Sequence, residues 1–149
     1  MRKTLATVVA AAIATVATAA PAAAAAKVGP HPFLDYVKPV KAHVATWVDV
    51  WWDTEKPVCD AKVWLSGRKV EVGYPANTET YSSFATASTL GPKDKPQRTA
   101  FRVTADYNRT AEVPLTAEIS YNTCGDNPVE KSKRFEIALT VLKNKTLVL

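Results

Sequence analysis

The chain has 149 residues, a length that fits one domain better than two, and a formal net charge of +5. Hydrophobic residues make up 47% of it, a figure that is inflated by 13 alanines among the first 26 residues. The remainder still has the composition of an ordinary, mildly basic folded domain, which excludes a disordered tail, a coiled coil and a membrane-embedded body.

The first 26 residues are organised like a secretory signal peptide. Arg2 and Lys3 form a basic start, an uncharged apolar stretch covers residues 5–19, and small-x-small sites follow at 17–19 and 24–26. A transmembrane anchor is the alternative, but few residues besides alanine are strongly apolar and a proline interrupts the run. We expect cleavage after Ala26 or Ala19, and a product that is secreted, extracellular or cell-wall associated, without stable membrane insertion. The leader resembles those of precursors exported by actinobacteria.

The two cysteines are expected to form a disulfide between Cys59 and Cys124. An even pair in an oxidising compartment is normally bonded, whereas most zinc sites need four ligands. A catalytic thiol is the alternative, but neither cysteine lies near His31 or His43 in the sequence. We therefore expect no metal site and no cofactor.

Residues 27–43 are predicted to form an N-terminal linker, and residues 44–149 the folded domain. Two prolines favour an extended conformation at 27–33, and residues 34–40 are a candidate edge strand limited by Pro39. Residues 44–52 alternate, with one parity buried, and residues 58–65 repeat the pattern before a turn at Ser66–Gly67 that leads to a strand at 69–72.

The second half of the chain adds three clear strands. Residues 81–90 are ambiguous and are taken as a weak strand, and residues 91–96 as a surface loop. The inward positions of the three later strands are expected to be Phe101, Val103, Ala105, Tyr107; Val113, Leu115, Ala117, Ile119, Tyr121; and Phe135, Ile137, Leu139, Val141. Because no segment has helical periodicity, the fold class is all-β, and about seven strands predict two packed antiparallel sheets.

The strand count, the domain length and the separation of Cys59 from Cys124 resemble an immunoglobulin-like β-sandwich. Two features depart from that family. No tryptophan follows the first cysteine at the usual distance, and Tyr121 precedes Cys124 by three residues where the tyrosine corner has two. The expected bridge is therefore peripheral, and the resemblance concerns architecture and carries no functional residues.

A tryptophan-bearing face is the candidate ligand site. If residues 54–57 close a β-hairpin in register, residues whose numbers sum to 111 lie opposite one another. The outer face then pairs Trp47 with Trp64, Asp49 with Lys62, and Trp51 with Asp60. Indole faces can stack on sugar rings, while the charged side chains between them can bind hydroxyl groups. The alternative is that residues 34–40 or a neighbouring strand cover this face and make the tryptophans a second small core.

Motifs for catalysis are missing from the sequence. It has no G-x-S-x-G, no H-E-x-x-H and no glycine-rich phosphate loop, so we expect no enzyme activity.

The basic residues fall in short runs mixed with acids, which does not favour nucleic acid as a partner. We expect a secreted, non-catalytic binding or interaction module. Its partner is a polysaccharide, the cell wall or an extracellular protein. The alternatives are a carbohydrate-binding domain that uses the tryptophan face and an inhibitor of an extracellular hydrolase that uses residues 91–96.

Overall fold

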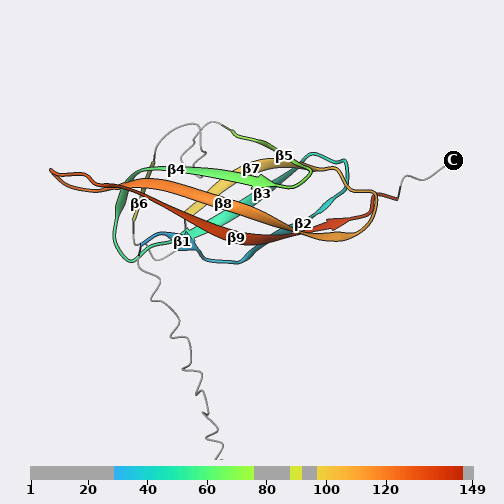
Figure 1. Cartoon of the computed structure of the whole chain (residues 1–149), viewed down its shortest axis with the longest axis horizontal. Coiled ribbons are helices and arrows are strands. Elements are labelled where there is room, and N and C mark those ends of the chain that lie inside the picture. Colours follow the sequence, from blue (N-terminus) through green and yellow to red (C-terminus); the bar gives the residue numbers. More distant parts are fainter. Residues whose placement is uncertain (1–28, 76–87, 92–96, 146–149) are drawn as a thin grey trace, which may run out of the picture.

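A computed structural model describes residues 29–75, 88–91 and 97–145, and within these ranges the protein is all-β (Figure 1). This part of the chain contains no helix long and apolar enough to cross a membrane. Its strands are β1 (His31–Pro32), β2 (Tyr36–Lys41), β3 (Thr46–Asp53), β4 (Val58–Gly67), β5 (Val70–Gly73), β6 (Ser88–Leu90), β7 (Gln97–Ala105), β8 (Ala111–Thr123) and β9 (Glu130–Leu142). The weak strand expected at 81–90 is confirmed at its end as β6. The signal-peptide segment and residues 81–87 lie outside the described ranges.

The strands form one curled, hydrogen-bonded sheet in the order β1-β3-β7-β5-β4-β8-β9-β2, with β6 paired to β4. Strands β4, β8 and β9 lie in front of β3 and β7 (Figure 1). Strand β5 connects the layer of β3 and β7 with the layer of β4, β8 and β9. It pairs along its length with β7 but pairs with β4 only where Val70 lies opposite Gly67. A Cβ at Gly67 would lie 2.5 Å from Leu115 Cδ2, so a larger residue here must displace the buried Leu115 side chain.

A single core fills the inside of the curl. The inward positions expected from alternation on β3, β4, β7, β8 and β9 are confirmed over most of their length. Phe101, Leu115, Ile119, Ile137 and Leu139 are among the largest fully buried side chains. The indole of Trp52 is also buried and donates through Nε1 to Thr99 Oγ1 at 2.8 Å. Val44 is an exception: β3 begins only at Thr46, and the Val44 side chain is 37% exposed.

The predicted hairpin between β3 and β4 is wrong. Strand β3 pairs with β7, with Trp47 opposite Arg102 and Trp51 opposite Arg98, and β4 pairs with β8. The connection at 54–57 is a compact turn from one layer to the other, in which the Thr54 hydroxyl donates to the Lys56 carbonyl at 2.7 Å. Alternation fixed the inward parity of β3 but not its partner, because any neighbour of the right parity satisfies it.

The expected edge strand is confirmed as β2, which closes one side of the sheet. It runs parallel to β9, however, so the sheet is not antiparallel throughout as expected. Pro39 lies inside β2, where the register shifts between Val37 and Val40. A proline is tolerated there because an edge strand leaves some backbone donors without a ladder partner. The segment predicted as linker also contributes β1, which pairs with the end of β3.

Candidate functional site

The outward face of β3 carries three of the predicted site residues, Trp47, Asp49 and Trp51. Successive strand residues point to opposite sides, so these three point outward while Val48 and Val50 enter the core. Segment 34–40, expected as a cover for this face, instead forms β2 beside β9 at the far end of the strand order. Trp47 is 48% exposed and Trp51 is 36% exposed, so that covering arrangement is wrong.

Two arginines of β7 flank these tryptophans and complete a surface that we call the tryptophan ridge: Trp47, Asp49, Trp51, Arg98 and Arg102. Arg98 donates from a guanidinium nitrogen to Asp49 Oδ2 at 3.2 Å, and its Cζ lies 6.0 Å from the centroid of the Trp51 ring. A guanidinium at that distance is attracted by the ring's electron-rich face. Register places Arg102 opposite Trp47. The ridge therefore alternates flat apolar surfaces with fixed hydrogen-bonding groups.

The other three predicted site residues, Asp60, Lys62 and Trp64, lie on β4 in the other layer. Asp60 has a positive φ of 52°, at the position where the β4–β8 register shifts, and accepts a hydrogen bond from Asn122 Nδ2 at 3.0 Å. The structure thus does not bring these residues to Trp47 and Trp51. The expected platform of three indoles is wrong because it depended on the β3–β4 hairpin.

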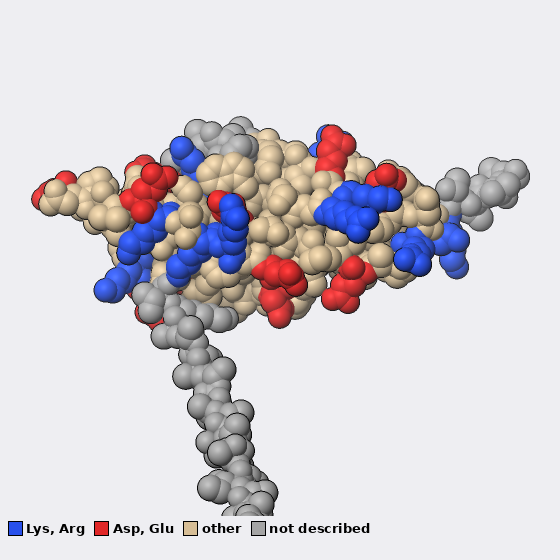
Figure 2. All heavy atoms as spheres, viewed as in Figure 1, with Lys and Arg blue, Asp and Glu red and all other residues tan. Residues whose placement is uncertain are grey.

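Trp64 belongs to the outer face of β4, β8 and β9, which Figure 2 shows from outside. Lys and Arg side chains gather toward both ends of this face, with acidic side chains beside and between them (Figure 2). Trp64 is half-buried opposite Glu118, which accepts a hydrogen bond from Arg134 Nε at 2.8 Å. A shallow depression of about 490 Å³ is lined here by Trp64, Glu118, Ser120, Glu130 and Ser132.

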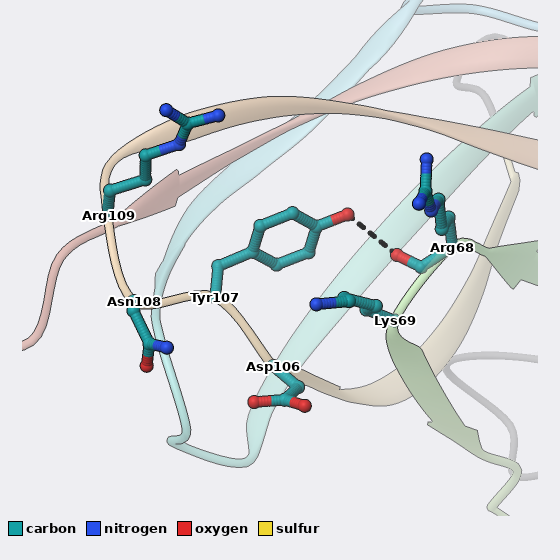
Figure 3. Close-up of a pocket in the computed structure, with 6 residues that line it drawn as sticks. All are labelled: Arg68, Lys69, Asp106, Tyr107, Asn108 and Arg109. Atoms are coloured by element: carbon teal, nitrogen blue, oxygen red, sulfur yellow. Dashed lines mark hydrogen bonds between the residues drawn. The ribbon is translucent and has the colours of Figure 1, made fainter.

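Sequence reasoning missed a second depression, of about 470 Å³, where the β4–β5 turn meets the β7–β8 loop (Figure 3). We call it the basic depression; Arg68, Lys69, Asp106, Tyr107, Asn108 and Arg109 line it. The two turns are far apart in the sequence and come together because β5 pairs with β7, bringing Val70 opposite Ala105. The only sequence signal was the adjacent pair Arg68 and Lys69. The 106–109 loop carries one acid and one base, and nothing in either turn predicted the other as its neighbour.

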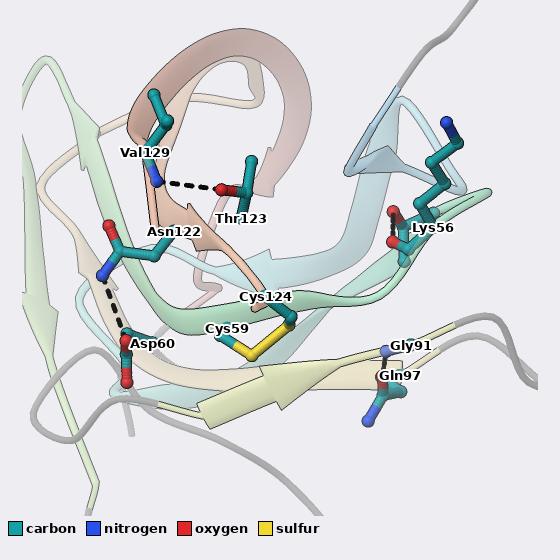
Figure 4. The surroundings of a disulfide bond; sticks show 10 residues. Lys56, Cys59, Asp60, Gly91, Gln97, Asn122, Thr123, Cys124 and Val129 are labelled. Atoms are coloured by element: carbon teal, nitrogen blue, oxygen red, sulfur yellow. Dashed lines mark hydrogen bonds between the residues drawn. A yellow bond between two sulfur atoms is a disulfide. The ribbon is translucent and has the colours of Figure 1, made fainter. Parts of the chain in front are cut away.

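The disulfide between Cys59 and Cys124 is confirmed (Figure 4). It ties β4 to the residue that follows β8, two neighbouring strands, and is therefore peripheral as expected. Neither cysteine is a free thiol. A groove of about 550 Å³ runs beside it, lined in part by Lys56, Pro57 and Tyr121, and burial raises the pKa of the Tyr121 phenol.

The remaining candidates for chemistry are dispersed. The described ranges contain no group of three or more His, Cys, Asp or Glu side chains placed to hold a metal ion. His31 Nδ1 lies 2.9 Å from the Gly29 carbonyl, and His43 lies beside Asp106 at the opposite end of β3. Of the segment 91–96 that was predicted as an inhibitory loop, residues 92–96 lie outside the described ranges. The residues on either side of them are joined by a hydrogen bond from the Gly91 N–H to Gln97 Oε1 at 2.8 Å.

Comparison with known proteins provides no assignment. The sequence matches no protein-family model, and no curated protein is significantly similar to it.

Proposed function

We propose that this chain is an exported, non-catalytic binding module with an immunoglobulin-like β-sandwich fold, and that the tryptophan ridge binds a polysaccharide such as a cell-wall glycan. The observation that carries the proposal is the exposure of Trp47 and Trp51 on one strand, with Asp49 between them and its ion-pair partner Arg98 beside Trp51.

The strand order supports the immunoglobulin-like part of the proposal. Immunoglobulin constant-type domains place strands A, B, E and D in one sheet and C, F and G in the other. Here β1, β3, β7 and β5 follow one another in the sheet, and β4, β8 and β9 follow after them. If β1, β3, β4, β5, β7, β8 and β9 are lettered A to G along the chain, the first group is A, B, E and D, and the second group is C, F and G. The disulfide differs, because it joins β4 to the end of β8 within one layer.

The geometry of the ridge supports a polysaccharide ligand. Trp47 and Trp51 are four residues apart on a strand, so their rings are separated by roughly 13 Å at about 3.3 Å per residue. That separation suits a row of sugar rings that stack on the indoles, while the Asp49 carboxylate accepts hydrogen bonds from hydroxyls and the Arg98 guanidinium donates to them. Arg98 is held by its ion pair with Asp49 and by the Trp51 ring, so little side-chain entropy is lost on binding.

The disulfide supports the proposed location. Structural disulfides persist in oxidising compartments and are rare in the cytosol, so the Cys59–Cys124 bond is in keeping with export.

Depletion assays test this function. The purified protein would be incubated with insoluble cellulose, chitin and peptidoglycan, and the free protein measured. Retention by at least one polymer is expected, with Trp47→Ala and Trp51→Ala each weakening it about tenfold, as expected for aromatic anchors of an interface. Trp64→Ala on the other outer face is the matched control and should change retention less than twofold. The proposal fails if no polymer retains the protein, or if the three variants lose retention equally.

A further inference from the structure

The basic depression at the β4–β5 and β7–β8 turns has an excess of positive charge. Arg68, Lys69 and Arg109 contribute three cations and Asp106 one anion, giving a local excess of two positive charges. Lys143 lies at the same end, where its backbone N–H donates to Thr110 Oγ1 at 3.1 Å.

The three lining cations have no ion pair with any residue in the described ranges. Two arginines of the outer faces are by contrast paired, Arg98 with Asp49 and Arg134 with Glu118. In the basic depression the one carboxylate, Asp106, instead faces His43, whose Nδ1 lies 3.4 Å from Asp106 Oδ1. Arg68, Lys69 and Arg109 are thus available to an external anion.

The backbone around the depression is held in place from several sides. The Asp106 N–H donates to the Lys69 carbonyl at 2.8 Å, and the Tyr107 hydroxyl donates to the Arg68 carbonyl at 2.8 Å (Figure 3). Lys69 and His43 both have positive φ angles, of 54° and 59°. Non-glycine residues adopt this left-handed conformation at an energetic cost, so the hydrogen bonds around the two turns must hold them in place.

We propose that the basic depression binds a phosphoryl group, either as the free ion or carried on a sugar. The excess of two positive charges matches a phosphate dianion, and the three cations line the depression around the Tyr107 ring (Figure 3). Guanidinium groups bind phosphate oxygens through two parallel hydrogen bonds, which a lysine alone does not provide.

The size of the depression accommodates more than the ion itself. Its volume of about 470 Å³ falls within the range of small-molecule sites, and the Tyr107 ring and Asn108 amide line it alongside the cations. A sugar attached to the phosphoryl group could contact these two side chains. This proposal is independent of the tryptophan ridge, since it uses none of the ridge's residues.

Amide chemical shifts measured by NMR during titration test the proposal. The purified protein would be titrated separately with inorganic phosphate, glucose 6-phosphate and acetate at constant ionic strength. Saturable shifts at residues 68–69 and 106–109 are expected with both phosphates, and much weaker binding with the acetate monoanion. Tighter binding of glucose 6-phosphate would identify a phosphorylated sugar as the source, and equal binding would identify the free ion.

Four variants make the test specific. Arg68→Gln and Arg109→Gln should each weaken phosphate binding about tenfold, the effect of losing a charge-assisted hydrogen bond. Asp106→Asn should tighten it a few-fold, because it removes the one negative charge. Lys38→Gln, on the exposed side of β2, is the matched charge control and should leave binding unchanged. The proposal is overturned if phosphate shifts are scattered over the surface, if acetate binds equally well, or if folded Arg68→Gln and Arg109→Gln proteins bind phosphate as the wild type does.

Discussion

On the outer face of β3 and β7, Trp47 and Trp51 stand exposed beside Arg98 and Arg102. On the outer face of β4, β8 and β9, by contrast, Trp64 is half-buried opposite the Glu118–Arg134 ion pair. Both faces carry outward-pointing tryptophan among polar residues. They differ in what stands across from each tryptophan: a cation on the first face and a carboxylate, itself paired to an arginine, on the second. Trp47 and Trp51 are therefore open to solvent, whereas Trp64 is partly covered.

The largest expected loss of stability distinguishes a tryptophan on the inner side of β3 from one on its outer side. Trp52→Ala should lower the free energy of unfolding by about 3–5 kcal/mol, since it empties a buried site and leaves the Thr99 hydroxyl without its Trp52 donor. Trp51→Ala, one residue earlier and exposed, should cost about 1 kcal/mol or less. Urea denaturation measures both. Similar losses for the two variants would mean that Trp51 is part of the core.

Removing the disulfide tests how much this bond stabilises the layer of β4, β8 and β9, which contains Trp64. Replacing both Cys59 and Cys124 by serine should destabilise the fold by about 2–4 kcal/mol, because the bond closes a sequence separation of 65 residues in the unfolded chain. Thermal unfolding of the double variant, compared with the oxidised wild type, gives the value. A midpoint equal to that of the wild type would contradict a stabilising role.

The passage between the two layers is tested at Gly67. Gly67→Ala should cost about 1–3 kcal/mol, because its Cβ would be 2.5 Å from Leu115 Cδ2 and the packed core must shift. Gly73→Ala, at the end of β5, is the matched control. Its Cβ would make only ordinary contacts at 3.6 Å with Arg102, so a small change in the denaturation midpoint is expected. Equal costs at both glycines would argue against the close approach.

The smallest effects are expected from the two surface ion pairs. Asp49→Asn and Glu118→Gln should each change the free energy of unfolding by less than about 1 kcal/mol, because ion pairs that solvent reaches are weak and screened by salt. Their effects on polysaccharide retention should differ. Asp49→Asn removes an anchor of Arg98 on the ridge and should weaken retention, whereas Glu118→Gln should not. Retention that follows Glu118 instead would move the site to the other face.

Several features of the fold could be predicted from the sequence because they depend on local patterns. Alternation gave the buried side of β3, β4, β7, β8 and β9, and cysteine arithmetic gave the disulfide. The pairing of strands was not predictable in this way. Trp64 and Trp47 have the same outward parity whether or not their strands are neighbours, and only the β3–β7 pairing reveals that Arg98 reaches Asp49 and Trp51.

The basic depression was hidden for a related reason. Arg68–Lys69 and residues 106–109 are each ordinary exposed turns, and their meeting depends on the long-range pairing of β5 with β7. One sequence contains no local signal for such a contact, because the side chains of the two turns are neither periodic nor matched in charge. The positive φ angle at Lys69 was likewise not indicated by its residue type.

Iodide quenching of tryptophan fluorescence, with and without the polysaccharide that retains the protein, tests the central claim most directly. The tryptophan ridge predicts that iodide quenches a distinct fraction of the emission, that the polysaccharide protects this fraction, and that folded Trp47→Ala and Trp51→Ala proteins each lose part of it. Two results would contradict the assignment of the ridge as the binding surface. One is emission that iodide does not quench. The other is quenching that the polysaccharide leaves unchanged and that Trp64→Ala abolishes.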